Sequence, residues 1–190
     1  MTFMLASASP RRKELLIQAG MVFKTVVSEI DESQFATEGI TAVTLSMKLA
    51  LEKAKDVAKK FPDQLVIGAD TVVDCNGLII GKPENPAHAE EITRMLFSQP
   101  HKVITGVALV RIADNTEIVE SATTIVYPRK LTEQQIADHI KNGNWQGKAG
   151  AYGIQDTGDE FVERIEGSFT NVIGLPMELV KKMLEKTKKQ

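Results

Sequence analysis

The stretch QLVIGADTVVDCNGLIIGKP, residues 64–83, carries the strongest structural signal in the sequence. Two apolar runs flank Asn76-Gly77, and an Asn-Gly pair in this setting is typical of a type I′ turn between two antiparallel strands. The pattern therefore predicts a β-hairpin in which Cys75 faces Leu78 across the turn. Because a hairpin pairs its strands antiparallel, the sheet of this protein is expected to include antiparallel pairing.

Asp70 interrupts the first of these apolar runs. A buried carboxylate needs an ion pair, hydrogen bonds or a metal, so Asp70 is a structural ion-pair partner, a residue near an exposed strand end, or part of a functional site. Counting outward from the turn pairs Thr71 with Lys82, which brings Lys82 within one residue of Asp70. In perfect register the two side chains point to opposite faces, so a bulge or frayed ladder near Gly81 is needed to aim both into one site. The alternative for Lys82 is a surface salt bridge that contributes little.

Strands and helices are predicted to alternate on both sides of the hairpin. Strands are expected at residues 3–7, 21–30, 161–165 and 168–174, with a longer antiparallel pair at 102–112 and 117–127. Helices are expected at residues 10–19, 41–60, 86–96 and 133–142, and a last helix is opened by Pro176. This order indicates an α/β protein with a mixed, twisted sheet flanked by helices. Since no repeat or linker divides the chain, residues 1–190 are expected to form a single domain.

The composition is that of an ordinary globular protein, with 43% hydrophobic and 25% charged residues. Twenty-three Lys and Arg residues against 25 Asp and Glu residues give a formal net charge of -2, which does not favour a nucleic acid polymer or a membrane surface as a partner. Cys75 is the only cysteine, so no internal disulfide forms, and a cytoplasmic location is expected. No apolar run is long enough for a signal peptide or a membrane span.

Arg11 and Arg12 follow Ser9-Pro10 at the predicted start of a helix. The N-terminus of a helix exposes unpaired N–H groups and carries partial positive charge, so cations are unfavourable there in isolation. The same N–H groups attract a phosphate, and arginines add charge-assisted contacts to it. We therefore interpret this segment as an anion site. The alternative is that the long side chains simply extend into water.

An acidic pair and a glycine-rich loop supply further candidates. Asp31 or Glu32 would join Asp70 around a hard cation such as Mg²⁺, which takes one or two carboxylates plus phosphate oxygens. The alternative is a loop that is merely solvated. The loop at residues 147–158 contains four glycines and carries Gln155, whose amide can read the edge of a base. Most glycine-rich loops, however, are only turns.

Several familiar catalytic motifs are absent from the sequence, among them the P-loop, the dinucleotide fingerprint and the nucleophile elbow. His88, His101 and His139 lack the spacing of metal ligands, so we interpret them as surface or packing residues. Cys75 has no basic neighbour in sequence to activate it, which favours a structural thiol.

Five motifs, in order along nearly the whole chain, resemble the signatures of the Maf family: Ser7–Arg12, Gly68–Thr71, Gly81–Pro83, Gly150–Gln155 and Asn171–Pro176. The resemblance implies a nucleoside triphosphate pyrophosphatase that uses a divalent metal, Mg²⁺ or Mn²⁺, and cleaves between the α and β phosphorus atoms. It also implies an α/β fold of two lobes with a central cleft, similar to the inosine triphosphate pyrophosphatases, and a homodimer.

The same resemblance implies roles for individual residues. Asp70 matches the proton acceptor of the family. The positions linked to base choice in the dTTP/UTP subgroup are matched by Arg11, Thr71 and Gln155. Other polar and basic site residues are matched by Ser9, Arg12, Lys53 and Lys82. The acidic site position falls on Asp31 or Glu32; we favour Glu32 as a metal ligand, together with Asp70.

Two alternative functions stay open at this point. A sister subgroup acts on 7-methyl-GTP, although Thr71 and Gln155 favour the dTTP/UTP subgroup. Maf proteins are also described as septum-formation inhibitors, so the second alternative is a nucleotide-binding regulator of cell division. A regulator would bind nucleotide without releasing pyrophosphate in excess of the protein, and this separates it from an enzyme.

Overall fold

The computed structural model describes residues 2–35, 39–154 and 160–187 of the chain. Within them, a mixed sheet of seven strands has the order β2-β1-β3-β5-β6-β7, with β4 paired to β3. The strands are β1 Thr2–Ala6, β2 Val22–Thr25, β3 Val66–Cys75, β4 Leu78–Ile80, β5 His101–Arg111, β6 Thr116–Pro128 and β7 Val162–Glu166. β1 pairs parallel with β2 and β3, and the other pairings are antiparallel. The predicted mixed α/β fold is confirmed.

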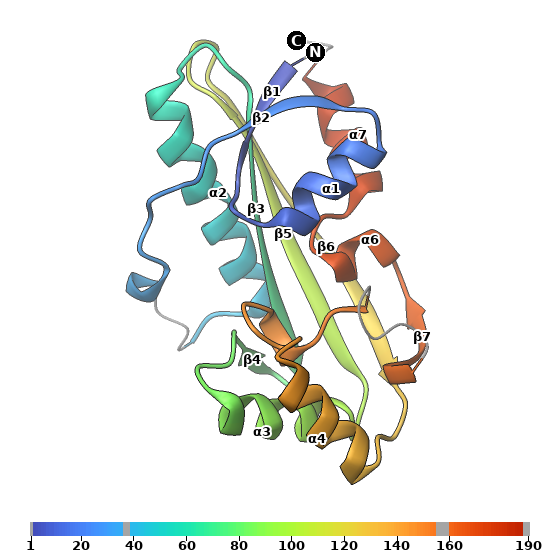
Figure 1. Cartoon of the computed structure of the whole chain (residues 1–190). Coiled ribbons are helices and arrows are strands. Elements are labelled where there is room, and N and C mark those ends of the chain that lie inside the picture. The colour runs from blue at the N-terminus through green and yellow to red at the C-terminus, as the bar shows by residue number, and fades with distance from the viewer. Residues whose placement is uncertain (1, 36–38, 155–159, 188–190) are drawn as a thin grey trace.

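Helices cover both faces of this sheet (Figure 1). The long helix α2, Ala42–Lys60, lies on one face against β3 and β5. Further helices of the described residues are α1 Pro10–Gln18, α3 Pro86–Leu96, α4 Glu133–Asn142, α6 Phe169–Ile173 and α7 Met177–Lys186, with short 3-10 turns η1 Glu32–Gln34 and η2 Ala149–Ala151. In Figure 1, α1 and α7 lie with β1 and β2 at one end of the long strands, and α3 and α4 lie with β4 at the other. These two ends are the two lobes.

Two glycines allow α2 to approach the sheet very closely. A Cβ atom at Gly68 of β3 would lie 2.1 Å from the carbonyl oxygen of Ala50, and one at Gly106 of β5 would lie 2.3 Å from that of Ser46. Both distances are far below van der Waals contact, so only glycine fits at these crossings. Because alternate residues of a strand share a face, the same crossing places α2 over Asp70.

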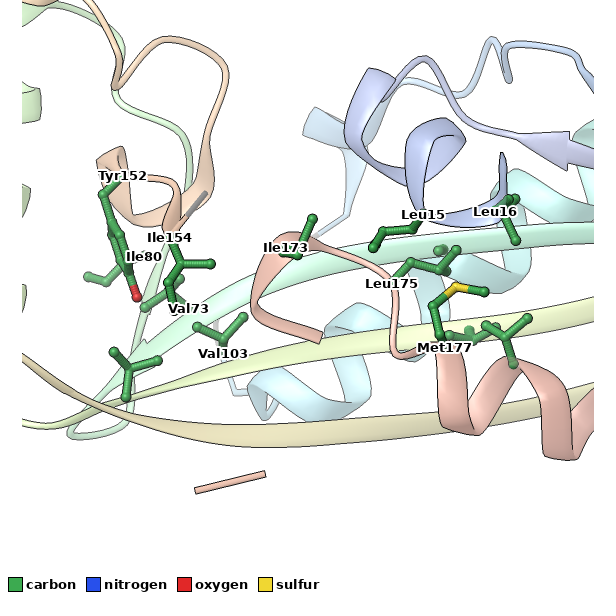
Figure 2. Close-up of a cluster of buried hydrophobic side chains, with 14 of the residues drawn as sticks. Leu15, Leu16, Val73, Ile80, Val103, Tyr152, Ile154, Ile173, Leu175 and Met177 are labelled. Atoms are coloured by element: carbon green, nitrogen blue, oxygen red, sulfur yellow. The ribbon is translucent and has the colours of Figure 1, made fainter. Parts of the chain in front are cut away.

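The opposite face of the sheet carries a large apolar cluster. Figure 2 shows its side chains in two groups with Ile173 between them. One group contains Val73, Ile80, Val103, Tyr152 and Ile154, and the other contains Leu15, Leu16, Leu175 and Met177. One continuous apolar cluster therefore spans both lobes, with Ile173 between its two groups (Figure 2).

Local signals predicted most of these elements correctly. Asn76-Gly77 has φ values of 52° and 85°, as a type I′ turn requires, and Cys75 pairs with Leu78. Ser9 caps α1, and the predicted capping box opens α4.

No helix in the described part of the chain is long and apolar enough to cross a membrane.

The strand predicted at residues 168–174 is wrong, because this segment forms the short helix α6. The side chain of Ser168 accepts a hydrogen bond from the Asn171 N–H and so caps the helix. The buried amide of Asn171 then donates to the Val103 carbonyl and to the Thr124 hydroxyl, both on the sheet. These distant partners outweigh the strand preference of the local sequence.

Two other expectations were only partly right. The second strand is Val22–Thr25 rather than residues 21–30, because its partner β1 ends at Ala6. Thr71 does not pair with Lys82: β4 ends at Ile80, opposite Val73. The pairing of β3 with β4 thus ends before Gly81. Lys82 lies outside the ladder, so its side chain is not forced to the face opposite Asp70.

Candidate active site

One edge of β3 is left open between two partners. β1 pairs with Val66–Gly68 and β4 with Val73–Cys75, and among the described strands none pairs with the same edge between them. A cavity of about 310 Å³ lies here, lined by residues of both lobes. Because the edge is open, Asp70 on the α2 face of β3 and Thr71 on the opposite face line the same cavity.

The Lys53 ammonium lies between two carboxylates at this cavity. It donates to Asp70 Oδ1 at 2.6 Å and is 2.8 Å from Glu32 Oε1, while Lys82 Nζ is 3.9 Å from Glu32 Oε2. Lys53 and Asp70 are buried, and Glu32 is exposed. Partial desolvation opposes the ionisation of Glu32, but the bond from Lys53 and the charges of Lys53 and Lys82 outweigh it and hold the pKa of Glu32 below its ordinary value.

Asp31 makes only local contacts. Its carboxylate accepts hydrogen bonds from the N–H and the hydroxyl of Ser33, at 3.0 and 2.6 Å, and from the Gln34 amide at 3.1 Å. Asp31 thereby caps η1 and does not line the cavity. Of the two acidic residues that the sequence left open, the structure brings Glu32 to Asp70.

Arg12 is largely engaged with the protein itself. Its Nε donates to the Gly174 carbonyl at 2.8 Å, and its Nη1 donates to the Ala69 carbonyl at 2.9 Å and to Ser7 Oγ at 3.1 Å. Its Nη2 donates to Thr71 Oγ1 at 3.0 Å. A guanidinium has five N–H donors, so these contacts leave about one for a ligand. Arg12 therefore ties α1, β3 and the turn after α6 together around the cavity.

Burial changes the pKa of Arg12, and residues close to Arg12 in the chain line the cavity with it. Burial lowers the pKa of Arg12 below its ordinary value, although the negative charge of Asp70 opposes the change. Ser9 accepts a hydrogen bond from the Arg12 backbone N–H at 3.4 Å, as the cap of α1. Ser9 and Arg11 both line the cavity, as do Lys53 and Lys82.

The glycine-rich loop forms another wall. Gly150 N–H donates to the Gly81 carbonyl at 3.1 Å and so holds this loop against the segment that carries Lys82. Tyr152 lines the cavity, and its hydroxyl lies 2.8 Å from Nε2 of buried His101. Burial lowers the pKa of His101 to about 4, so this ring is neutral at pH 7 and serves packing. The predicted base-reading residue Gln155 lies outside the described residues.

Several groups at the site were missed by sequence reasoning. Ser7 and Gly174 accept hydrogen bonds from Arg12. Both lie inside the family motifs quoted above, so the motifs could have identified them. Thr105 sits in an apolar strand with no such signal, yet its Oγ1 lies 2.9 Å from that of Thr71. Asn171 Oδ1 is buried without a hydrogen-bond partner among the described residues.

The oxygen atoms at the cavity suit a hard cation. Mg²⁺ is bound in proteins by one or two carboxylates plus phosphate oxygens, and Asp70 and Glu32 supply two carboxylates joined by one lysine. Among the described residues, no group of three or more His, Cys, Asp or Glu side chains is placed to hold a metal ion. The donor set therefore fits a metal whose remaining ligands come from a polyphosphate and water.

Comparisons with known proteins point to one family. The family profile described as "Maf-like protein" matches residues 2–187. A dTTP/UTP pyrophosphatase of Elusimicrobium minutum is 44% identical, over 97% of this chain and 98% of that protein. One of Clostridioides difficile is 40% identical, over 98% and 95%. Among solved structures, the Staphylococcus aureus Ham1 protein is similar with a TM-score of 0.48 and 13% identity, over 68% of this chain and 73% of that chain.

Proposed function

The chain belongs to the Maf family, and on this premise we propose that it is a nucleoside triphosphate pyrophosphatase that hydrolyses dTTP and UTP to the monophosphate and pyrophosphate. Relatives of similar length carry the name dTTP/UTP pyrophosphatase. The observation that carries the proposal is the meeting of Lys53 with Asp70 and Glu32 at an open sheet edge, beside further basic residues. Such a set suits a polyphosphate and the base that activates water.

Binding of the phosphate chain is assigned to the basic residues of the lining. Arg11, Arg12, Lys53 and Lys82 line the cavity with Glu32 and Asp70, so four positive charges exceed two negative ones and favour a multiply anionic ligand. Charge-assisted hydrogen bonds of this kind are about twice as strong as neutral ones. The repulsion expected from arginines at the start of α1 is relieved when the triphosphate is present, and this explains why the sequence tolerates them.

Asp70 is the proposed general base. Its Oδ1 is held by Lys53, which orients the carboxylate, and its other oxygen would take a proton from the attacking water. The water attacks the α phosphorus in line with the bond to the β phosphate. Lys82 and Arg11 then stabilise the negative charge that develops on the departing pyrophosphate.

A divalent cation, Mg²⁺ or Mn²⁺, belongs to this proposal. Glu32 and Asp70 would hold it, because hard cations prefer carboxylate oxygens. The two oxygens of the Asp70 carboxylate have about four lone-pair sites, so Asp70 can accept from Lys53, bind the cation and still take a proton. When bound, it neutralises charge on the phosphate oxygens and polarises the phosphoryl group.

The proposal also covers the setting of the activity. We place it in the cytoplasm, which fits the single, buried free thiol of Cys75. The homodimer implied by the family resemblance stays a prediction, which analytical ultracentrifugation would test.

A panel of nucleotides tests the proposed function. Purified protein is incubated with dTTP, UTP, CTP, ATP, GTP and 7-methyl-GTP in the presence of Mg²⁺ or Mn²⁺, and pyrophosphate and orthophosphate are quantified separately. We expect pyrophosphate in large excess over protein, equal in amount to the monophosphate, with dTTP and UTP preferred. Release of orthophosphate alone, or pyrophosphate that never exceeds the protein, would contradict the proposal.

A further inference from the structure

The open edge of β3 at the cavity carries the proposed base. β1 pairs with this edge as far as Gly68, and β4 pairs with it only from Val73 onward. Asp70 lies between these two ladders, while the other edge of β3 pairs with β5 throughout residues 66–74. Among the described strands, the segment around Asp70 is therefore paired on one edge only, and its second edge leaves backbone groups available to another partner.

Arg12 supplies such a partner. Its Nη1 donates to the carbonyl of Ala69 at 2.9 Å, and Ala69 directly follows the last residue of β3 that pairs with β1. Its Nη2 donates to Thr71 Oγ1 at 3.0 Å. Since Ala69 and Thr71 are the two chain neighbours of Asp70, the guanidinium holds β3 on both sides of the proposed base.

The guanidinium is itself fixed by two further contacts. Its Nε donates to the Gly174 carbonyl at 2.8 Å, in the turn after α6, and its Nη1 donates to Ser7 Oγ at 3.1 Å, after the end of β1. Arg12 is only 9% exposed. Because its planar group presents donors in a rigid fork, contacts in several directions fix its orientation. Arg12 therefore holds β3 in a set position relative to α6 and β1.

A count of donors shows that these contacts nearly exhaust the Arg12 side chain. Nε carries one hydrogen and each Nη carries two, and the contacts use Nε, both hydrogens of Nη1 and one of Nη2. A fork-shaped contact with a phosphate needs two parallel N–H groups, and only one is left. Thr71 is saturated as well, because its hydroxyl contacts Arg12, Thr105 Oγ1 at 2.9 Å and the Gly174 carbonyl oxygen at 3.4 Å. Both side chains thus act on protein groups.

We propose that Arg12 is a positioning residue for Asp70: it holds the backbone of β3 so that the carboxylate stays aligned with the attacking water. Lys53 orients the carboxylate group from α2, and Arg12 fixes the main chain that carries it. The charge of Arg12 still adds to the positive field of the cavity, but its hydrogen bonds are made to the protein. The inference rests on the proposed function, since it requires Asp70 to be the base.

The main test replaces Arg12 with lysine. Arg12→Lys keeps the positive charge, but a single ammonium cannot reproduce contacts made in several directions by a fork. Arg111→Lys is the matched control, because Arg111 pairs with exposed Asp114 and does not line the cavity. For each protein, kcat and KM are measured with UTP. Kd is measured by calorimetry with a UTP analogue that has an imido group in place of the oxygen between the α and β phosphorus atoms.

We expect kcat of Arg12→Lys to fall about 10- to 100-fold, because a small displacement of a catalytic group is enough for such a loss. The Kd of the analogue should stay within about threefold of the wild type. A phosphate ligand would behave differently, since loss of a charge-assisted contact would raise Kd about 10-fold or more. A generally disordered cavity would raise Kd and lower kcat together. Either of these patterns, or an unchanged kcat, would overturn the inference. Arg111→Lys should keep kcat and Kd within about twofold of the wild type.

A smaller change decides the question by itself where Arg12→Lys does not fold. Thr71→Val keeps Arg12 and removes one of its two contacts beside Asp70. We expect kcat for UTP, dTTP and CTP to fall by a common factor of about 3- to 10-fold, the effect of one hydrogen bond. Thr93→Val is the control, because Thr93 is also buried but bonds to the Ala89 carbonyl within α3. A changed preference among the three nucleotides would place the Thr71 hydroxyl against the base and overturn the inference, as would an unchanged kcat.

Amide hydrogen exchange, read by NMR, separates this inference from the proposed function because it requires no turnover. In Arg12→Lys and Thr71→Val, the amides of residues 69–71 should exchange about 10-fold faster than in the wild type, whereas Arg111→Lys and Thr93→Val should leave them unchanged. Unchanged protection of residues 69–71 in the first two variants would overturn the inference. A wild-type protein that releases no pyrophosphate would defeat the proposed function, while the exchange rates would still show whether Arg12 holds β3.

Discussion

The ammonium of Lys53 lies 2.6 Å from Asp70 Oδ1, and both residues are buried. They belong to different elements, α2 and β3, and the glycine crossing at Gly68 brings these elements together. The contact gives the proposed base a fixed orientation and a compensating charge. It also predicts how the protein responds when either partner is changed.

Replacing Lys53 should destabilise the protein strongly. Lys53→Met leaves the Asp70 carboxylate buried without its partner, and removal of one member of a buried pair costs about 3–5 kcal/mol. Urea unfolding at pH 7 measures the loss. Lys55→Met is the matched control, because Lys55 lies on the same helix as Lys53 but forms an exposed pair, with Glu117 of β6, whose loss should cost less than about 1 kcal/mol. Equal losses of unfolding free energy in the two variants would show that the buried Lys53–Asp70 pair stabilises the protein no more than the exposed Lys55–Glu117 pair.

Replacing Asp70 should abolish turnover without unfolding the protein. Asp70→Asn keeps the shape of the side chain but removes the proton acceptor, so kcat should fall about 10²- to 10⁴-fold. Asp74→Asn is the control on the same strand: the Asp74 carboxylate accepts from the Gly77 N–H and does not line the cavity. Pyrophosphate release and circular dichroism are measured together. Wild-type turnover in Asp70→Asn would exclude Asp70 as the base.

The two adjacent acidic residues should differ in their effect on the metal requirement. Glu32→Gln removes a carboxylate at the cavity and should raise the Mg²⁺ concentration for half-maximal activity by about 10-fold or more. Asp31→Asn changes only the cap of η1 and should leave that concentration unchanged. Metal titrations of both variants give the comparison. A larger change in the Mg²⁺ requirement of Asp31→Asn than of Glu32→Gln would indicate that Asp31, and not Glu32, is the metal ligand.

The glycine crossing beneath Asp70 should tolerate no side chain. A methyl group at Gly68 would meet the Ala50 carbonyl oxygen at 2.1 Å, and such overpacking costs about 1–3 kcal/mol or more. Gly68→Ala should therefore lower the free energy of unfolding and weaken activity by displacing α2. Gly81→Ala, where nothing lies within 4 Å of the added atom, should stay within about 0.5 kcal/mol of the wild type. A stable Gly68→Ala would mean that α2 shifts at little cost.

Stability should fall in mild acid because of His101. Burial lowers the pKa of His101 from 6.5 to about 4, so between these values the unfolded chain binds more protons than the folded protein. The stabilisation gained by keeping His101 neutral is fully present above pH 6.5 and is lost as the pH falls toward 4. Over this range the free energy of unfolding should fall by about 3 kcal/mol in total. His101→Gln should flatten this part of the stability profile, which urea unfolding at a series of pH values measures. An unchanged slope in His101→Gln would place the acid sensitivity elsewhere.

Much of the fold was predictable because its signals are local. The Asn76-Gly77 turn, the Ser9 cap and the capping box of α4 each involve residues within a few positions of one another. The segment at residues 168–174 also carries a local signal, the Ser168 cap, but we predicted a strand there. Its helix depends on Asn171 reaching Val103 and Thr124, which are 68 and 47 positions away.

By itself the sequence determined the mixed α/β class, the hairpin and the family motifs, since these depend on residue type and short spacing. Only the tertiary structure shows which of the motif residues lie close together and which groups each of them contacts. Arg12 is in a motif, but only its bond to Gly174, 162 positions away, reveals that it ties the walls of the cavity together. Thr105 carries no motif signal and is identified only by its place opposite Thr71 in the ladder. The physical reason is that a hydrogen bond depends on distance in space, and local patterning does not encode contacts between elements far apart in the chain.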